Sequence, residues 1–530
     1  MSGRAPMSPR CLALLLGALS WAAAASPAPL TPLEQAGRKI YFEGESPTGG
    51  TIFATLGAGV RLPGSAVPCV NCHGEDGTGR PEGGVLPPDI TWTELTKPYG
   101  HVHPGGRKHP VLEDRSVARA ISEGVDPGGN RLDGVMPRYS MSSEDLTRLL
   151  AWLKRLEHER APGVTDSALR LGAVLPTRGR LGALGQAMRG VLEAYFDELN
   201  ASGGIHGRTL ELVVAGYDSD QETGLASARR LLEQEPVFAL LSGFLPGAEK
   251  ELAALAERAS LPLIGPFTLS AREEDTPERH VFFLLSDPGE QARVLAEYAA
   301  RELPQKGTGA VILHPEDAGL AGAARAARAR LQAHGWKQVE LLRYARGGFN
   351  PSLAADLKRK GTRVVLFLGN DAELTALMEK ARTLGWAPYL LLPGSLSARA
   401  AVEAPALFQG RIFLAYPTLP SDERPRARET FSRLRTRAPA PEGYRMAQVS
   451  AYTAATVLTE GLRRSGRQVS RKKLLGHLEG LYAFETGLVP PLSYGPNRRV
   501  GARGAYVVTV DLTARSFRPV TGWMDLIDGG

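Results

Sequence analysis

The sequence predicts two modules of different fold class, a small all-α module followed by a larger α/β module with two lobes. In residues 30–157, Gly- and Pro-rich loops separate two helical segments, whereas in residues 169–530 short apolar strands alternate with amphipathic helices. Residues 158–168 are interpreted as the linker, because a polar run is followed there by Pro162 and Gly163. We therefore expect two modules joined head to tail.

The most informative motif of the first module is the sequence CVNCH at residues 69–73. This spacing attaches haem c through two thioether bonds, here to Cys69 and Cys72, while the histidine, His73, binds the iron. A structural zinc site would need about four ligands and a further Cys pair, which the sequence lacks. A thioredoxin-like CxxC would sit between a strand and a helix, whereas a Gly-rich loop follows this motif. We predict one covalent haem.

Residues 1–25 predict a cleaved secretory signal, because Arg4 and Arg10 precede an apolar run that ends in small alanine residues. The third cysteine, Cys11, lies in this segment, so both cysteines of the mature chain belong to the haem and no disulfide can form within it. Export agrees with haem c chemistry, because this haem is attached outside the bacterial inner membrane. No other apolar run approaches the roughly 20 residues of a membrane span. We expect a periplasmic protein.

The loop around Met136 contains the best candidate for the second axial ligand of the iron. It precedes a helix that Ser142 or Ser143 can cap, and the leucines of this helix form one apolar stripe: Leu146, Leu149, Leu150, Leu153 and Leu156. The other candidate ligands are Met141, His101, His103 and His109. We interpret Met141 as a packing residue and the three histidines as part of a solvated loop. Two alternatives stay open, a separate metal site at these histidines and a haem ligated by two histidines.

The order of these features resembles that of class I c-type cytochromes. In that family an N-terminal helix, here around residues 37–41, crosses the C-terminal helix, and a Met-Pro loop closes over the iron. The resemblance covers roughly residues 31–157 and implies a monohaem domain in which His73 and Met136 ligate the iron. Thioether sulfur favours ferrous over ferric iron, so this ligation implies a relatively high potential and outer-sphere electron transfer.

Apolar segments of the second module predict the strands of parallel sheets, because amphipathic helical segments lie between most of them and imply βαβ units. The predicted strands are residues 169–175, 210–215, 237–241, 261–264, 281–285, 310–313, 339–342, 364–368, 389–392 and 412–416. So long a module exceeds one doubly wound sheet. Two doubly wound sheets, one in each lobe, are therefore expected.

The start of this module resembles the periplasmic solute-binding proteins of branched-chain amino acid and amide ABC importers. The resemblance rests on the opening strand at residues 171–176 and on the segment NASGGIHG at residues 200–207, where Gly203 and Gly204 permit a left-handed turn. It implies the periplasmic-binding-protein fold, with hinge crossovers between lobes that close over a ligand. We place lobe 1 at about residues 169–287 and 418–488, and lobe 2 at about residues 288–417 plus the C-terminal segment.

The ligand residues of that family are matched poorly in this sequence. The resemblance implies five ligand candidates: Phe244, Thr268, Asp317, Ser395 and Tyr416. Of these, Phe244 and Tyr416 also fit core or rim packing at strand ends. The family holds an α-carboxylate near residues 264–269 and pairs an acidic residue with the α-amino group, for which no counterpart stands near Gly394. A zwitterionic amino acid would leave buried charge unpaired, at a cost of several kcal/mol. We expect a different ligand, or none.

Several function classes are excluded by the sequence. It contains no GxSxG, GxxxxGK[ST] or HExxH motif, so we expect a protein that is not an enzyme. The formal net charge is +7, and the arginines of residues 424–437 are interpreted as a solvated helix face. Nucleic acid is not an expected partner, because the chain is exported and lacks interleaved surface aromatics.

The leading hypothesis is a periplasmic electron carrier whose second module recognises a small molecule or docks a partner oxidoreductase. Covalent fusion would hold the haem at roughly millimolar effective concentration near anything that this module binds. One alternative is the solute-binding component of an ABC importer, which would deliver an amino-acid-like or amide-like solute to an ABC permease. Another is a redox or ligand sensor in which closure of the lobes changes the haem potential.

Overall fold

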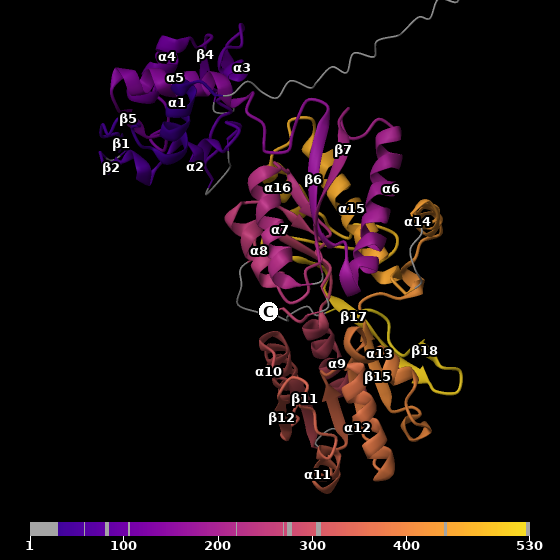
Figure 1. Ribbon diagram of the computed structural model, residues 1–530. Coiled ribbons are helices and arrows are strands. Elements are labelled where there is room, and N and C mark those ends of the chain that lie inside the picture. Colours follow the sequence, from indigo (N-terminus) through magenta and orange to yellow (C-terminus); the bar gives the residue numbers. More distant parts are fainter. Residues whose placement is uncertain are drawn as a thin grey trace, which may run out of the picture. The chain divides into compact units, whose positions relative to one another are not determined.

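A computed structural model describes residues 30–57, 59–79, 84–103, 106–218, 220–268, 270–272, 278–303, 309–438 and 443–525 (Figure 1). The chain divides into two compact units, Met1–Glu159 and Arg160–Gly530. The predicted signal segment, residues 1–25 with Cys11, lies outside the described residues. In the described ranges, no helix is both long and apolar enough to cross a membrane.

The first unit consists of helices with two small antiparallel sheets. Its helices are α1 (Pro32–Glu43), α2 (Cys69–His73), α3 (Trp92–Leu95), α4 (Asp114–Ser122) and α5 (Ser143–Leu156). A 3-stranded sheet has the order β2 (Arg61–Pro63), β1 (Phe53–Thr55), β5 (Arg138–Ser140), and a hairpin joins β3 (His101–Val102) to β4 (Lys108–His109). The unit is mainly helical, as predicted, and the short strands are an addition to the expected all-α module.

Helices α1 and α5 cross and enclose the core of the first unit. A capping box formed by Thr31 and Glu34 begins α1, and the Ser142 hydroxyl caps α5 by accepting a hydrogen bond from the backbone N–H of Asp145. The core of this unit is built from the predicted leucine stripe and aromatic residues: Leu149, Leu153, Leu156, Tyr41 and Trp152 are all buried. Both predicted helices and the Ser142 cap are therefore confirmed.

We expect Gly37→Ala to destabilise the first unit by about 1–3 kcal/mol, because overpacking forces packed elements apart. An added Cβ at Gly37 would lie 1.9 Å from the Arg148 carbonyl oxygen on α5. Thermal unfolding of the haem-loaded chain, followed at the haem absorption band, measures this loss. Gly476→Ala is the control, because nothing lies within 4 Å of a Cβ added there. An unchanged midpoint for Gly37→Ala would contradict the close crossing.

The first lobe of the second unit has a 6-stranded parallel sheet. Its strand order is β16 (Val500–Ala502), β10 (Val281–Leu285), β9 (Leu263–Ile264), β8 (Ala239–Leu241), β6 (Ala168–Pro176), β7 (Thr209–Tyr217). One core contains residues of the sheet and of α6 (Gly182–Ala201), α14 (Pro425–Arg437), α15 (Arg445–Ser465) and α16 (Arg471–Glu479). A second core contains residues of α7 (Gln221–Gln234) and α8 (Glu249–Arg258). The sheet is thus buried between two helical layers, as expected for parallel strands.

The second lobe has an 8-stranded mixed sheet. Its strand order is β12 (Val339–Tyr344), β11 (Ala310–Pro315), β13 (Val364–Phe367), β14 (Tyr389–Pro393), β15 (Ile412–Tyr416), β17 (Gly504–Asp511), β18 (Ser516–Pro519), and β19 (Met524–Asp525) also pairs with β17. Its helices are α9 (Pro288–Glu302), α10 (Ala318–Ala333), α11 (Leu353–Arg359), α12 (Asp371–Thr383) and α13 (Gly394–Val402). The sheet is parallel up to β15 and antiparallel from β17 onward.

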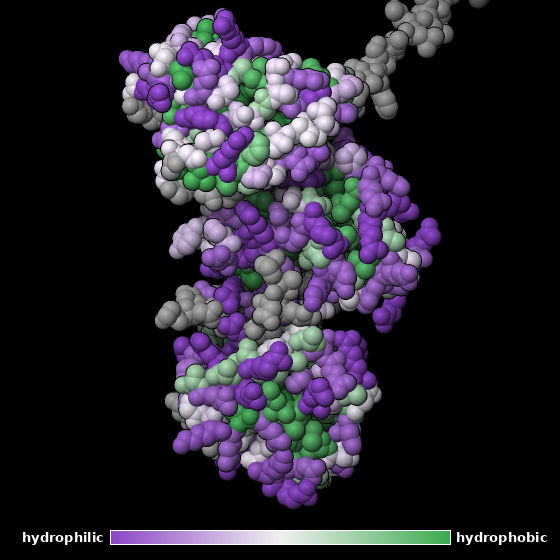
Figure 2. All heavy atoms as spheres, turned by 90° about the vertical axis from the view of Figure 1, so that its left-hand side faces the viewer, coloured by the Kyte–Doolittle hydropathy of each residue, from purple (hydrophilic) through white to green (hydrophobic). Residues whose placement is uncertain are grey.

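The face of the molecule in Figure 2 shows mostly hydrophilic residues over the second unit. Its apolar residues are collected in the cores of the two lobes, which lie on both faces of each sheet. The second unit therefore has the surface expected of an α/β module whose sheets are covered by helices.

Two predicted boundaries differ from the structure. Lobe 1 does not end near residue 488, because β16 pairs in parallel with β10 of its sheet, and the chain crosses to the other lobe only at Arg503. The predicted linker at residues 158–168 is also too long. The Arg170 N–H donates to the Gly163 carbonyl and Val164 is buried, so this stretch already belongs to the second unit.

Candidate functional site

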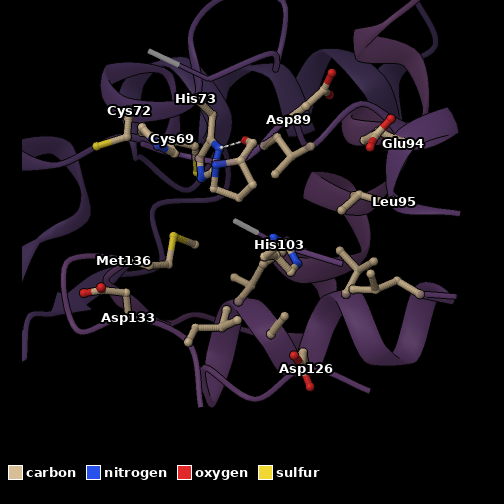
Figure 3. A pocket seen from close by; sticks show the side chains of 18 of the residues that line it. Cys69, Cys72, His73, Asp89, Glu94, Leu95, His103, Asp126, Asp133 and Met136 are labelled. Carbon is tan, nitrogen blue, oxygen red and sulfur yellow. Dashed lines mark hydrogen bonds between the residues drawn. The ribbon is translucent and has the colours of Figure 1, made fainter. Parts of the chain in front are cut away.

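A cavity of about 740 Å³ lies within the first unit (Figure 3). Cys69, Cys72, His73 and Met136 all line it. Most of its wall is apolar, with contributions that include Ile90, Leu95, Leu112, Val117, Ile121 and Leu153. The structure thus places both predicted thioether cysteines and both predicted axial ligands around one apolar cavity.

Helix α2 positions the two cysteines and the histidine. Cys69 and Cys72 are three residues apart, so they project from the same side of this short helix. The next residue, His73, is buried, and its Nδ1 lies 3.2 Å from the Pro88 carbonyl oxygen. Because a carbonyl only accepts, Nδ1 carries the proton and Nε2 keeps a lone pair for a metal. Burial also lowers the pKa of His73, which favours the neutral, ligating imidazole.

The loop that carries Met136 is held by Arg138, a residue that the sequence analysis did not identify. The Arg138 guanidinium donates to the backbone carbonyls of Met136 and of Leu132, the latter at 2.8 Å. The Met136 N–H donates to the Asp133 carbonyl at 3.2 Å. These bonds fix the loop while the Met136 side chain lines the cavity. An arginine directly after a Met-Pro pair was the only signal for this role in the sequence.

These residues fit a covalently bound haem. Two thiols on one side of a helix match the two thioether bonds, and a buried neutral imidazole and a thioether side chain match the axial ligands of a c-type iron. The apolar wall suits a macrocycle that must be shielded from water. Cys69 and Cys72 would hold the haem, with His73 and Met136 as its ligands.

The three histidines do not form the predicted solvated loop. His101, His103 and His109 all line the same cavity, and only 8% of His109 is exposed. The reason is the β3–β4 hairpin, which pairs His101 with His109 and turns the side chains inward. Among the described residues, no group of three or more His, Cys, Asp or Glu side chains could hold a metal ion. Met141 packs against the core of this unit, as expected.

Two of the ligand candidates in the second unit are aromatic residues at strand ends. Phe244 is buried in the core of lobe 1, with its ring centroid 5.4 Å from that of Phe267, which agrees with the packing alternative. Tyr416 is half-buried at the end of β15, with its ring centroid 5.3 Å from that of Phe517. Burial is the main cause that raises the pKa of Tyr416, which keeps its hydroxyl protonated.

The polar candidates bond to neighbouring side chains. Thr268 and Ser270 both donate their hydroxyl groups to the carboxylate of Glu249, over 3.3 and 3.0 Å. Asp317 caps α10 by accepting from the Leu320 N–H. The backbone N–H of Ser395 lies 3.4 Å and its hydroxyl 3.2 Å from the Gln291 side-chain oxygen. The Glu249 carboxylate thus accepts a hydrogen bond from the Thr268 hydroxyl, the group that the resemblance assigned to a ligand carboxylate.

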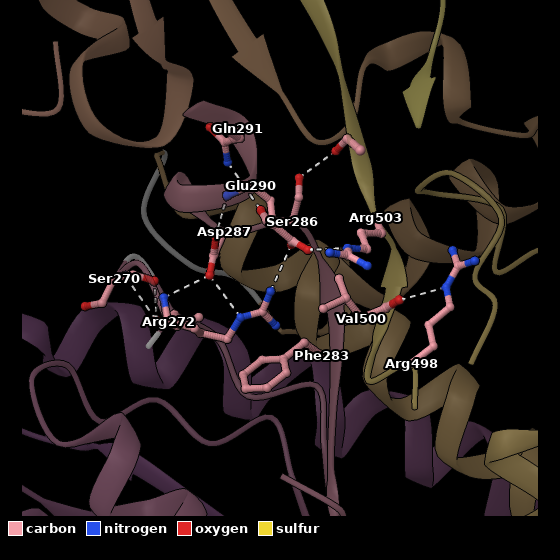
Figure 4. Close-up of polar contacts among 12 residues, drawn as sticks. Ser270, Arg272, Phe283, Ser286, Asp287, Glu290, Gln291, Arg498, Val500 and Arg503 are labelled. Carbon is pink, nitrogen blue, oxygen red and sulfur yellow. Dashed lines mark hydrogen bonds and ion pairs between the residues drawn. The ribbon is translucent and has the colours of Figure 1, made fainter. Parts of the chain in front are cut away.

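A cluster of buried ion pairs connects the lobes where the chain crosses between them (Figure 4). Arg272 donates to Asp287 and to Glu290, each over 2.9 Å, and Arg503 donates to Glu290 over 3.1 Å. Beside this cluster the Ser286 hydroxyl donates to the Gly504 carbonyl over 2.6 Å. No local sequence pattern indicates this cluster, because its members are far apart along the chain.

Comparisons with known proteins assign both units. Residues 168–516 match the family described as periplasmic binding protein, and residues 58–157 match cytochrome c. Among curated relatives, an amino acid binding protein of Pseudomonas aeruginosa is 27% identical over 218 residues, which are 41% of this chain and 57% of that protein. A Leu/Ile/Val-binding protein homolog of Brucella melitensis is 25% identical over 238 residues, 43% of this chain and 58% of that protein. The chain spans less than two thirds of the length of these relatives.

Solved structures share the fold of the second unit. A branched chain amino acid ABC transporter structure from Thermus thermophilus with bound valine has 17% identity and a TM-score of 0.54, over 68% of this chain and 96% of that one. A fatty acid ABC transporter substrate-binding protein from Thermomonospora curvata has 17% identity and a TM-score of 0.54, over 69% and 95% of the two chains. A cytochrome c domain implies covalently bound haem c. The chain belongs to the periplasmic binding protein family and carries a cytochrome c domain ahead of its binding module.

Proposed function

We propose that the chain is an exported periplasmic electron carrier with a fused binding module. One haem c is bound to Cys69 and Cys72 and ligated by His73 and Met136, and it supplies reversible one-electron exchange between ferrous and ferric iron. The observation that carries this proposal is the convergence of these four side chains on one apolar cavity. The second unit binds a small solute or docks a partner oxidoreductase.

The contacts of the three histidines favour Met136 over a second histidine as iron ligand. The Nε2 atoms of His103 and His109 lie 3.0 Å apart and bond to each other, and His101 Nε2 bonds to the Glu94 carbonyl. Each of these Nε2 atoms would have to leave its partner to reach the iron, so within the cluster only Nδ1 of His103, which has no hydrogen bond among the described residues, is left as an alternative ligand atom. The loop that carries Met136 is already held by hydrogen bonds from the Arg138 guanidinium to its backbone carbonyls. With two protein ligands, no substrate binds the iron, so the chain is accessory to a partner oxidoreductase and not itself an enzyme.

An exposed apolar rim of the haem cavity supports docking of a redox partner. Leu86, Val102 and Val135 line the cavity, and 71%, 72% and 47% of these residues are exposed. Exposed apolar residues beside a buried redox centre suit a transient interface, in which partners approach without displacing many charges. The rim is the surface at which electrons enter and leave.

A second candidate function is favoured by the names of the relatives, which are called amino acid binding and Leu/Ile/Val-binding proteins. In this role the chain would be the solute-binding component of an ABC importer and would contact an ABC permease. The Thr268 and Ser270 hydroxyl groups already donate hydrogen bonds to Glu249, so they are not available to the carboxylate of an amino acid ligand. A ligand sensor that shifts the haem potential on closure is a variant of this role.

Electron exchange with a soluble redox acceptor tests the proposed function in the full-length, haem-loaded chain. We expect one haem per chain, resistant to acidic extraction, and reversible oxidation and reduction. Replacement of both Cys69 and Cys72 by alanine should abolish the covalent attachment. A chain that carries no covalent haem would refute the electron-carrier proposal.

A thermal-shift panel of amino acids, amides, alcohols, aldehydes and carboxylates separates the candidate roles of the second unit. A solute at 100 times its dissociation constant adds about 2.7 kcal/mol to the free energy of unfolding. A solute that raises the unfolding temperature but leaves the haem potential unchanged indicates a receptor. A solute that changes both quantities indicates a sensor. No shift across the panel indicates that the second unit docks a protein.

A further inference from the structure

We propose that His103, held in place by His109, donates a hydrogen bond to a haem propionate and so fixes the propionate end of the haem. This inference rests on the proposed haem site, and it gives a role to a histidine cluster that ligation of the iron does not use. It makes His103 a positioning residue whose protonation is coupled to the redox state of the iron.

The hydrogen-bond chain of the cluster uses Nε2 of His103, a residue that lines the cavity, and leaves its Nδ1 without a hydrogen bond among the described residues. His109 Nδ1 lies 2.7 Å from the Pro110 carbonyl oxygen, so this nitrogen carries the proton and His109 Nε2 is an acceptor. His103 Nε2, 3.0 Å away, therefore donates to it. Among the described residues this is the only side-chain hydrogen bond of His103. When His103 is protonated, its Nδ1–H is available to an anion in the cavity.

The position of His103 matches the propionate edge of the haem. The thioether bonds join the cysteines to one edge of the macrocycle, and the two propionates extend from the opposite edge. Figure 3 shows Cys72 on one side of the cavity and His103 away from it, toward Leu95. Met136 lies on the side of the cavity across from His73 in the same view. His103 therefore lies at the end of the cavity away from Cys72, where we place the propionates.

The charges around the cavity require donors at that end. The carboxylates of Asp126 and Glu94 line the cavity, and two propionates would add negative charge beside them. Asp126 is compensated by Arg107 at 2.6 Å, and Glu94 by Lys97. The Tyr41 and Tyr139 hydroxyl groups of the wall already donate to the Gly74 and Val67 carbonyls, and the histidines are further proton donors of the described wall. A propionate next to His103 thus has a partner that can carry a positive charge.

The electrostatics of His103 determine how the potential depends on pH. Burial and the positive Arg107, with smaller effects of His109 and His101, lower the pKa of His103, and Asp126 partly opposes this. A propionate would raise that pKa. Reduction removes one positive charge from the iron, so the pKa of His103 is higher in the reduced than in the oxidised protein. The potential therefore falls as the pH rises from the oxidised-state pKa to the reduced-state pKa, and is constant outside this window.

Redox titrations of the full-length haem-loaded chain between pH 5 and pH 9, about the range in which histidines titrate, test the proposal. We expect the wild type to show the falling segment and His103→Leu to lose it. His103→Asn retains an N–H near the Nδ1 position but cannot titrate, so it should lose the pH dependence and keep the wild-type haem spectrum. His158→Leu is the matched control, because His158 is exposed and does not line the cavity.

The outcomes separate this inference from the proposed function. A falling segment retained in both His103 variants would overturn it, as would its absence from the wild type. If His103→Leu does not bind haem, the presence or absence of the falling segment in His103→Asn alone tests the inference. Loss of the low-spin haem spectrum in both variants would show that His103 is an iron ligand, which also overturns the inference. A wild-type chain without covalent haem would refute the proposed function itself before any variant is compared.

Discussion

Met136→Leu is expected to lower the reduction potential of the haem by about a quarter or more of the roughly 0.8 V range that axial ligands set. A thioether ligand stabilises ferrous iron, and leucine has nearly the same volume without a donor atom. The cavity shape is therefore retained while the ligand is lost. A spectroelectrochemical titration of the full-length chain measures the shift, together with the loss of the far-red absorption band of sulfur-ligated ferric haem.

Met141→Leu is the matched control for this prediction. Met141 packs against the core of the same unit, so its replacement should leave both the potential and the far-red band unchanged. If Met136→Leu kept the wild-type potential and Met141→Leu had a lower one, Met141 would be the iron ligand and Met136 the packing residue.

Arg272→Ala is expected to destabilise the second unit by about 3–5 kcal/mol, because removing one partner of a buried ion pair leaves the other charge uncompensated. The side chains of Asp287 and Glu290 are only 6% and 10% exposed, and Arg272 bonds to both. Urea unfolding of the full-length chain, followed by far-UV circular dichroism, measures the loss. Arg346→Ala is the control, because 71% of the Arg346 side chain is exposed, and its pairing with Asp317 is expected to contribute at most about 1 kcal/mol.

The loss in Arg272→Ala should depend on pH with a defined sign. Burial is the main cause that raises the pKa of Glu290 in the folded chain, and Arg272 opposes this effect. Without Arg272 the folded-state pKa of Glu290 rises further above its unfolded value. The resulting penalty is complete above the folded-state pKa and disappears below the unfolded-state pKa, so the variant should approach wild-type stability as the pH falls. A loss that grows toward low pH would contradict this role of Glu290.

The parts of the structure that follow a local pattern could be predicted from the sequence. β10 and β15 begin and end at the predicted residues, because each is a continuous apolar run between polar segments. The haem-binding motif is a contiguous signature, and the Ser142 cap follows from a hydroxyl residue in front of an apolar stripe. In these cases the information lies within a few neighbouring residues.

The parts that depend on distant residues could not be predicted. β16 is too short and too rich in small residues for a strand signal, and only its pairing with β10 defines it. The inward turn of His101 and His109 depends on the hairpin that pairs them. The ion pair of Glu290 with Arg503 joins residues that are 213 positions apart, and such contacts leave no period in the sequence. For the same reason, the burial of Phe244 could not be predicted from the sequence.

The central claim is that the chain carries one electron on one haem ligated by His73 and Met136. A stoichiometric reductive titration of the full-length, haem-loaded protein, followed by absorption spectroscopy, tests it most directly. We expect the uptake of one electron per chain, with the far-red thioether band present in the oxidised protein and absent after reduction. An oxidised spectrum without that band would refute Met136 ligation, and an uptake other than one electron per chain would refute a single haem.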